Sequence, residues 1–215
     1  MFARISYFKG TAPQIDAATA LIRDRIEPSL RTQAGFLGLA TVVDRATREG
    51  HSATYWSTGT DMGAAEKMAV AARSELAERT GVHLTDVDRF EVLLQDRVAR
   101  SAVGTFGRTT ELHGAPDKVD ATVAFMQDEG ISLLRPRQGY RAMMVMANRA
   151  TGRMRITSAW NSAAERDNTE QVPSNIREDV AHIAGSPDFR ITCYEVVLAI
   201  VSEAAQQAAT TVRAT

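Results

Sequence analysis

The feature that most constrains this chain is an internal repeat. Shifting the sequence by 104 residues places Phe2 on Phe106 and Trp56 on Trp160 without a gap. Further matched pairs are Arg4 and Arg108, Gly35 and Gly139, Arg73 and Arg177, Gly81 and Gly185, Glu91 and Glu195. One offset that holds from the first predicted strand to the last indicates a tandem duplication. The chain must therefore fold as two copies of one unit.

The sequence pattern of each copy predicts the element order β-α-β-β-α-β. A Thr cap, a first-turn Pro and a Gln three residues after the cap mark the start of the first helix at 11–14, and Gly35 ends that helix. Apolar residues at helical spacing indicate a second helix over 62–76, which Gly81 ends. The predicted strands of the first copy cover 2–8, 36–43, 51–56 and 90–95.

This order predicts the α+β class, with two tandem ferredoxin-like units that form an intramolecular pseudo-dimeric α+β barrel. The expected boundaries are a first repeat at 1–98, a linker at 99–104, a second repeat at 105–201 and a disordered tail at 202–215. In the first strands, the apolar phase of Phe2, Phe8, Phe106 and Leu112 is expected to face away from the helices. Packing of one sheet on the other would bury it.

The second copy departs from the first at Pro173, which falls where the first copy has Ala69 inside a helix. Proline is tolerated in a first turn but not in a helix interior. We therefore expect the last helix to start near Pro173 and to be short, after a loop or short turn at 162–171.

Composition excludes several classes of function. The net charge of −1 provides no basic field for nucleic acid. No apolar run approaches the roughly 18 residues of a membrane span. A single cysteine excludes an internal disulfide. These features favour a cytoplasmic protein with no nucleic-acid or membrane partner, and no histidine-carboxylate spacing indicates a metal site.

Two short segments carry a family resemblance. Gly35-Phe36-Leu37-Gly38 opens the second predicted strand, and Tyr55-Trp56-Ser57 closes the third. The second copy has Gly139-Tyr140 and Ala159-Trp160-Asn161 in their place. With these residues the chain resembles the antibiotic-biosynthesis-monooxygenase-like family of dimeric α+β barrels, over both repeats. Members usually pair two chains, whereas here two fused repeats would form the barrel, and further homo-oligomerisation stays open.

The resemblance implies a range of activities. Some members oxygenate phenolic or anthrone-like compounds without metal or flavin, others cleave haem, and others have no known activity. The haem-cleaving members use an asparagine on the first strand and a tryptophan and a histidine near the second helix. Neither copy has that asparagine or tryptophan, although His182 lies in the second copy's last helix.

Several side chains are candidates for a site, each with a structural alternative. Trp56 and Trp160 would form either a pocket wall or a core anchor. Arg4 and Arg108 would bind a substrate oxyanion or form structural ion pairs with Glu91 and Glu195. His182 would be a general base, an axial haem ligand or a solvent-exposed residue.

The second copy is expected to hold the more open pocket. The phase of its first strand taken to face the helices is small and polar, with Gly107, Thr109 and Glu111. The predicted substrate-binding residues are Trp160, Thr109, Met144 and Trp56, and the predicted catalytic residue is His182.

Three functions remain open at this stage. The first is a cofactor-independent monooxygenase acting on a small hydrophobic phenol, quinol or anthrone. The second is a non-catalytic binder of a small hydrophobic molecule. The third is a haem-binding protein of the same fold, with His182 as the ligand.

Overall fold

The computed structural model describes residues 1–202, with the side chains of 171–175 excepted. The predicted tail at 202–215 therefore lies almost wholly outside the described residues. The chain divides into two compact units. Unit 1 contains Met1–Arg89 and the described residues from Val197 onward, and unit 2 is Phe90–Val196. Since β4 and β8 each run through a unit boundary, these units differ from the sequence repeats, whose predicted linker at 99–104 lies between β4 and β5.

The first repeat has the predicted element order, with its long helix interrupted by π-helical geometry. Its elements are β1 (Phe2–Lys9), α1 (Ala12–Leu21), a π-helix (Ile22–Ile26), α2 (Glu27–Arg31), β2 (Phe36–Asp44), β3 (Glu49–Trp56), α3 (Gly59–Ala64), α4 (Glu66–Thr80) and β4 (His83–Arg97). The predicted helix start is confirmed, because Gln14 accepts a hydrogen bond from the backbone N–H of Thr11 at 2.8 Å.

The second repeat follows the same order at the same offset. Its elements are β5 (Phe106–His113), a 3₁₀ turn (Pro116–Lys118), α5 (Val119–Phe125), a π-helix (Met126–Gly130), α6 (Ile131–Leu134), β6 (Tyr140–Asn148), β7 (Arg153–Trp160), α7 (Ala163–Asn168), α8 (Gln171–Ala184) and β8 (Phe189–Val201). The helix near Pro173 does begin there, at Gln171, but the expectation that it is short was wrong. Proline lies in its first turn, where no intrahelical hydrogen bond is lost.

The strands form a closed antiparallel order, β1-β3-β2-β8-β5-β7-β6-β4. Within unit 1, β3 pairs with both β1 and β2, and within unit 2, β7 pairs with both β5 and β6. Both β2 and β6 carry a register shift at the same repeat position, between Phe36 and Gly38 and between Tyr140 and Ala142. The α+β class, the two ferredoxin-like repeats and the barrel are thus confirmed.

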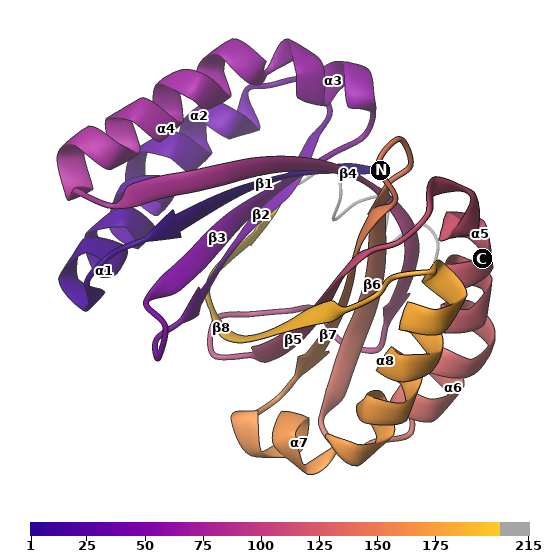
Figure 1. The fold of residues 1–215 in the computed structure, drawn as a ribbon. Helices are drawn as coiled ribbons and strands as arrows, with labels where there is room; N and C mark the ends of the chain where they lie inside the picture. Colours follow the sequence, from indigo (N-terminus) through magenta and orange to yellow (C-terminus); the bar gives the residue numbers. More distant parts are fainter. Residues whose placement is uncertain (203–215) are drawn as a thin grey trace, which may run out of the picture. The chain divides into compact units, whose positions relative to one another are not determined.

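Each unit buries one sheet face under its own helices. Figure 1 shows α1, α2 and α4 over the strands of unit 1, and α5, α6 and α8 over those of unit 2. In both cores a fully buried tryptophan packs edge-on against the ring that opens the second strand. The centroid distance is 5.6 Å for Phe36 and Trp56 and 5.6 Å for Tyr140 and Trp160.

The expected orientation of the first strands was wrong. Phe8 and Leu112 belong to the cores under the helices, so the phase that contains Arg4 and Arg108 faces the helices. Strand alternation separates two faces but does not say which of them a helix covers. The opposite phase is also buried, with Ile5 at 1% exposed, so hydrophobicity could not distinguish the faces.

A pair of glycine substitutions tests this packing in unit 1. A Cβ on Gly38 would lie 2.5 Å from the backbone oxygen of Ile200, while one on Gly63 would meet nothing within 4 Å. We expect Gly38→Ala to destabilise the protein by roughly 1–3 kcal/mol because backbone must shift. Gly63→Ala, in α3, should stabilise it by roughly 0.5–1 kcal/mol. Urea unfolding measures both, and a wild-type midpoint for Gly38→Ala would contradict the close approach.

Candidate functional site

A cavity lies in unit 1 between the sheet and its helices. Its volume is about 60 Å³, and its surface is predominantly apolar. The sheet contributes Ser6, Phe8, Leu39, Ser52, Thr54 and Leu84, and the helical segments contribute Ile22, Ile26, Leu30, Met68, Ala69, Ala72 and Leu76. The charged members of the lining are Arg4 and Arg73. An apolar hollow with a few polar groups is the usual form of a small-molecule site.

Arg4 is the most unusual of the lining residues. Its side chain is 2% exposed, and its Nη2 donates to Glu66 Oε2 at 2.8 Å and to the backbone oxygen of Met62. The guanidinium lies 5.8 Å from the ring centroid of Trp56. Its Nε and Nη1 atoms are buried and have no hydrogen-bond partner among the described residues. A buried guanidinium with free donors is costly unless a further acceptor reaches it.

Glu66, on α4, is the carboxylate that three arginines share. It accepts from Arg4, from Arg73 at 3.1 Å and from Arg89 at 2.8 Å. Burial by itself raises the pKa of this carboxyl. The hydrogen bonds from Arg89 and Arg73 and the charges of Arg4 and Arg89 outweigh burial and lower that pKa from 4.5 to about 2. Glu66 therefore stays ionised and holds the two lining arginines in place.

Burial also lowers the pKa of the Arg4 guanidinium. Glu66 opposes this effect, whereas the neighbouring charges of Arg89 and Arg73 add to it. Burial is the largest of these effects on the pKa, because desolvation disfavours the charged form, and the two like charges act in the same direction. A guanidinium nevertheless remains protonated in proteins. The cavity wall is therefore cationic at this point.

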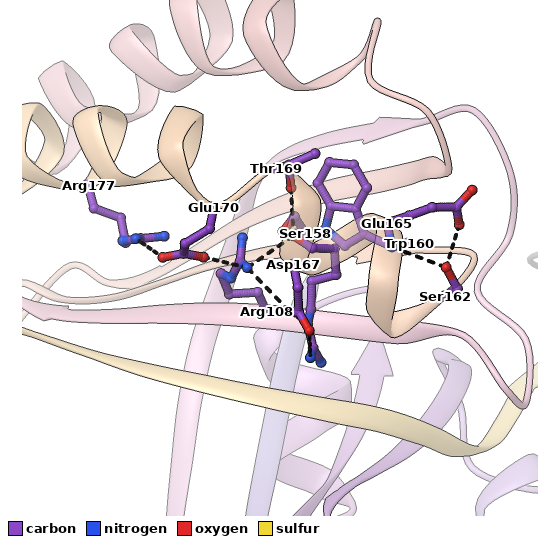
Figure 2. A network of polar contacts seen from close by, with 10 residues as sticks. Arg108, Ser158, Trp160, Ser162, Glu165, Asp167, Thr169, Glu170 and Arg177 are labelled. Carbon is purple, nitrogen blue, oxygen red and sulfur yellow. Dashed lines mark hydrogen bonds and ion pairs between the residues drawn. The ribbon is translucent and has the colours of Figure 1, made fainter.

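Figure 2 shows the matching arginines of unit 2, Arg108 and Arg177, with their acidic partners. Arg108 lies 2.5 Å from Glu170 Oε2 and 3.7 Å from Asp167 Oδ1, and Glu170 also pairs with Arg177. Asp167 falls where unit 1 has Gly63. The buried arginine of unit 2 thus has a second acidic residue nearby, but Asp167 is itself paired with Arg166 at 2.7 Å.

The repeat offset also shows why the first copy has space. Ser52 and Ala72 of the cavity correspond to Ile156 and Ile176, which pack in the core of unit 2. Ile26 corresponds to Gly130, but the methyl of Met126 would lie 2.4 Å from a Cβ there and takes up that space. Larger side chains at equivalent positions reduce the room under the helices of the second copy.

The expectation that Gly107, Thr109 and Glu111 lie under the helices of the second half was wrong. Gly107, Thr109 and Glu111 lie on the sheet face away from α8, because the other phase of β5 is the one in the core. The ring of Tyr194 would lie 2.2 Å from a Cβ on Gly107, so tyrosine uses the space that glycine leaves. Glu111 pairs with the buried Arg155.

The structure does not bring the predicted site residues together. Trp56 and Trp160 are both 0% exposed and belong to separate unit cores. Thr109 is also 0% exposed and lies 2.9 Å, Oγ1 to Oγ1, from Thr157 on the face away from the helices. Met144 is on that face too, since its neighbours Met143 and Val145 are the ones in the core.

His182 is exposed on α8. An exposed imidazole lacks the dry surroundings and fixed partner that a general base in a pocket needs. Its assignment as the catalytic residue stays a prediction without geometric support. Trp56 is the predicted site residue that adjoins the cavity, through its contact with Arg4.

The predicted partners of the two arginines were also wrong. Arg4 and Arg108 bind Glu66 and Glu170 on the helices rather than Glu91 and Glu195 on the last strands. Glu91 pairs instead with Arg149 at 3.0 Å. The signal was present in the repeat, because Glu66 and Glu170 match at the offset of 104 as their arginines do. Glu66 is the functional candidate that sequence reasoning missed.

The cavity residues do not suit haem. No histidine, cysteine or tyrosine is among the lining residues, and a volume of about 60 Å³ is far too small for a porphyrin. His182, the candidate axial ligand, belongs to the other unit and is exposed. Within residues 1–202, no group of three or more His, Cys, Asp or Glu side chains is arranged to hold a metal ion. In the same range, no helix is long and apolar enough to cross a membrane.

Comparison with known proteins agrees with the architecture. No family model matches the chain. Two uncharacterised proteins of Mycobacterium tuberculosis, from strains CDC 1551 / Oshkosh and ATCC 25618 / H37Rv, are 22% identical over 199 residues. Each alignment covers 93% of this chain and 88% of the relative. The duplication therefore falls within the aligned length.

Solved structures share the whole fold. A candidate monooxygenase from Fusobacterium nucleatum subsp. nucleatum has a TM-score of 0.68 at 10% identity and covers 93% of this chain and 94% of its own. An anthrone oxidase-like protein has a TM-score of 0.66 at 13% identity, covering 94% and 93%. A haem-degrading enzyme from Listeria monocytogenes has 0.53 at 10% identity, covering 91% and 99%. The chain has the fold of the antibiotic-biosynthesis-monooxygenase-like structures, as the sequence resemblance predicted.

Acid unfolding tests the charged network in unit 1. The folded-state pKa of Glu66 is lowered, so its ion pairs stabilise the protein above pH 4.5, and this contribution is lost as pH falls toward 2. We expect Glu66→Gln to lower the free energy of unfolding at pH 7, measured by urea unfolding. In this variant the free energy of unfolding should also fall less steeply than in the wild type as pH decreases from 4.5 toward 2. Glu75→Gln, on the same helix, removes surface pairs with Arg25 and Arg79 and should follow the wild-type profile. Parallel profiles for wild type and Glu66→Gln would contradict the assignment.

Proposed function

We propose that this chain is a cofactor-independent monooxygenase-like enzyme and that the unit 1 cavity binds its small hydrophobic aromatic substrate. The observation that carries the proposal is the apolar hollow between sheet and helices, with the buried and incompletely paired Arg4 in its wall. The fold supports it, since the similar structures include candidate monooxygenases and an anthrone oxidase-like protein.

The cavity volume favours the smaller substrates of the predicted class. An engineered cavity of about 150 Å³ in a protein core binds benzene. At about 60 Å³ this cavity is smaller, so a ring requires some displacement of its walls. Met68, Ile26 and Leu84 are half-buried members of the lining and are the side chains best placed to move. A one-ring phenol or quinol needs less displacement than a tricyclic anthrone.

The reaction balances without an external reductant. An electron-rich phenol and O₂ give a quinone and water: one oxygen atom is inserted at a ring C–H, and the other leaves as water with the two hydrogens removed. The substrate itself is the reductant. The chain would supply a dry pocket, orientation of the ring and positive charge near developing negative charge on oxygen. Arg4 is the side chain placed for the electrostatic role.

Filling the cavity tests the proposal. Ala72→Ile places in unit 1 the residue that unit 2 has at the same position. We expect oxygen uptake with methoxyhydroquinone or 1-naphthol, by metal-free and flavin-free protein, to fall by about tenfold or more in this variant. Incorporation of labelled oxygen from O₂ into the quinone separates monooxygenation from simple oxidation.

The matched control is Ala71→Ile, the same substitution at an exposed neighbouring position on α4. It has the same cost in helix propensity but does not face the cavity, so uptake should remain at the wild-type rate. Equal rates for Ala72→Ile and wild type would show that the reaction takes place elsewhere. No uptake by the wild type with any electron-rich phenol would refute the enzymatic proposal.

A further inference from the structure

Resting on this proposed function, we infer that the unit 1 cavity binds its aromatic ligand as an oxyanion, held by Arg4 and Arg73. The site would therefore select ionised phenols or carboxylates over neutral compounds of the same shape. The second copy, with the same two arginines, would not compete for this ligand.

Free donors are the first observation. Arg4 Nε and Nη1 and Arg73 Nη1 are buried, belong to the cavity lining and have no hydrogen-bond partner among the described residues. Nε and Nη1 of Arg108 and Arg177 in unit 2 are in the same state, so the copies differ in the space beside the arginines and in the third arginine, Arg89. An anionic oxygen accepts charge-assisted hydrogen bonds, which are stronger than those of a neutral hydroxyl or ether. The unpaired donors thus gain most from a charged ligand.

Charge balance is the second observation. Arg4 on β1 and Arg73 on α4 share one acidic partner, Glu66, and that carboxylate also accepts from Arg89 on β4. The buried Arg4, the half-buried Arg73 and the single carboxylate of Glu66 leave an excess positive charge at the cavity wall. Because the surroundings are apolar, this charge is screened less than it would be in water. A ligand anion would complete the pairing.

The second copy provides an internal comparison. Asp167 lies 3.7 Å from Arg108 but is hydrogen-bonded to Arg166 at 2.7 and 3.1 Å, so its charge is already balanced. The charge difference between the copies is therefore Cys193, which falls where unit 1 has Arg89. Ile156 and Ile176 pack where the cavity of unit 1 has Ser52 and Ala72. Both changes disfavour anion binding in unit 2: the first lowers the positive charge near the arginines, and the second reduces the space for a ligand. We expect one strong anion site in the chain.

The test is anaerobic binding of 4-nitrophenol and its neutral isostere 4-nitroanisole, with benzoate and benzamide as a second pair. We expect calorimetry to give one site per chain for 4-nitrophenolate, with 4-nitroanisole binding at least about tenfold more weakly. The absorption of bound nitrophenol should show its pKa lowered by at least about one unit, which is the same tenfold preference. A similar preference for benzoate over benzamide would show that the site accepts aromatic oxyanions in general. A preference seen only for 4-nitrophenolate would restrict the ligand class to phenolates.

Variants assign the site. Arg73→Gln and Arg4→Met should each remove most of the preference for the anion while 4-nitroanisole binding is retained. Arg108→Met, the matched change in unit 2, should leave the preference intact. If Arg4→Met does not fold, Arg73→Gln and the cavity-filling Ala72→Ile still decide the question, because Ala72→Ile should abolish binding of both compounds.

Equal affinity for 4-nitrophenolate and 4-nitroanisole, or an unchanged preference in Arg73→Gln, would overturn the inference. Such a result leaves the oxygenase proposal standing if methoxyhydroquinone still gives oxygen uptake. Conversely, selective anion binding without uptake for any electron-rich phenol would retain the anion site and refute the enzymatic role. The two failures are therefore distinguishable.

Discussion

The buried pairing of a first-strand arginine with a helical glutamate organises each unit. Arg4 and Glu66, like Arg108 and Glu170, connect the sheet to the helix that covers it. A guanidinium at 2–4% exposure requires such a partner, since an unpaired charge in an apolar core is strongly destabilising. The pair thereby connects the helix to the sheet, and Arg4 also lines the space between them. In unit 1 that space is the cavity.

Duplication allowed the two copies to diverge around this shared interaction. The first has small residues below its helix and a third arginine at its glutamate, whereas the second has isoleucines and an additional aspartate near the buried arginine. Both copies retain the tryptophan that packs against the second strand and the glycines with positive φ that end their helices. Structural requirements are thus met twice, while the proposed ligand site belongs to the first copy.

The fold of this chain does not by itself determine its chemistry. Structures with TM-scores of 0.53–0.68 include candidate monooxygenases and a haem-degrading enzyme, so the fold accommodates more than one chemistry. The site must distinguish them. An apolar cavity without histidine, cysteine or tyrosine in its lining, and with a buried arginine, suits a small aromatic oxyanion better than a porphyrin.

The sequence by itself determined the duplication, the element order and the fold class. Apolar periodicity and helix caps can be read from short segments, and the constant offset is found by aligning the sequence with itself. It also contained the arginines and their glutamates as matched pairs, although the pairing could not be read from spacing. Only the tertiary structure decided which strand face the helices cover, since both faces of β1 are buried and alternation is symmetric between them. That choice directed Arg4 toward Glu66, moved the candidate site from the second copy to the first, and placed Thr109 and Met144 away from Trp160. Side chains distant in sequence share a cavity only when backbone orientation brings them there, and the sequence pattern does not contain that orientation.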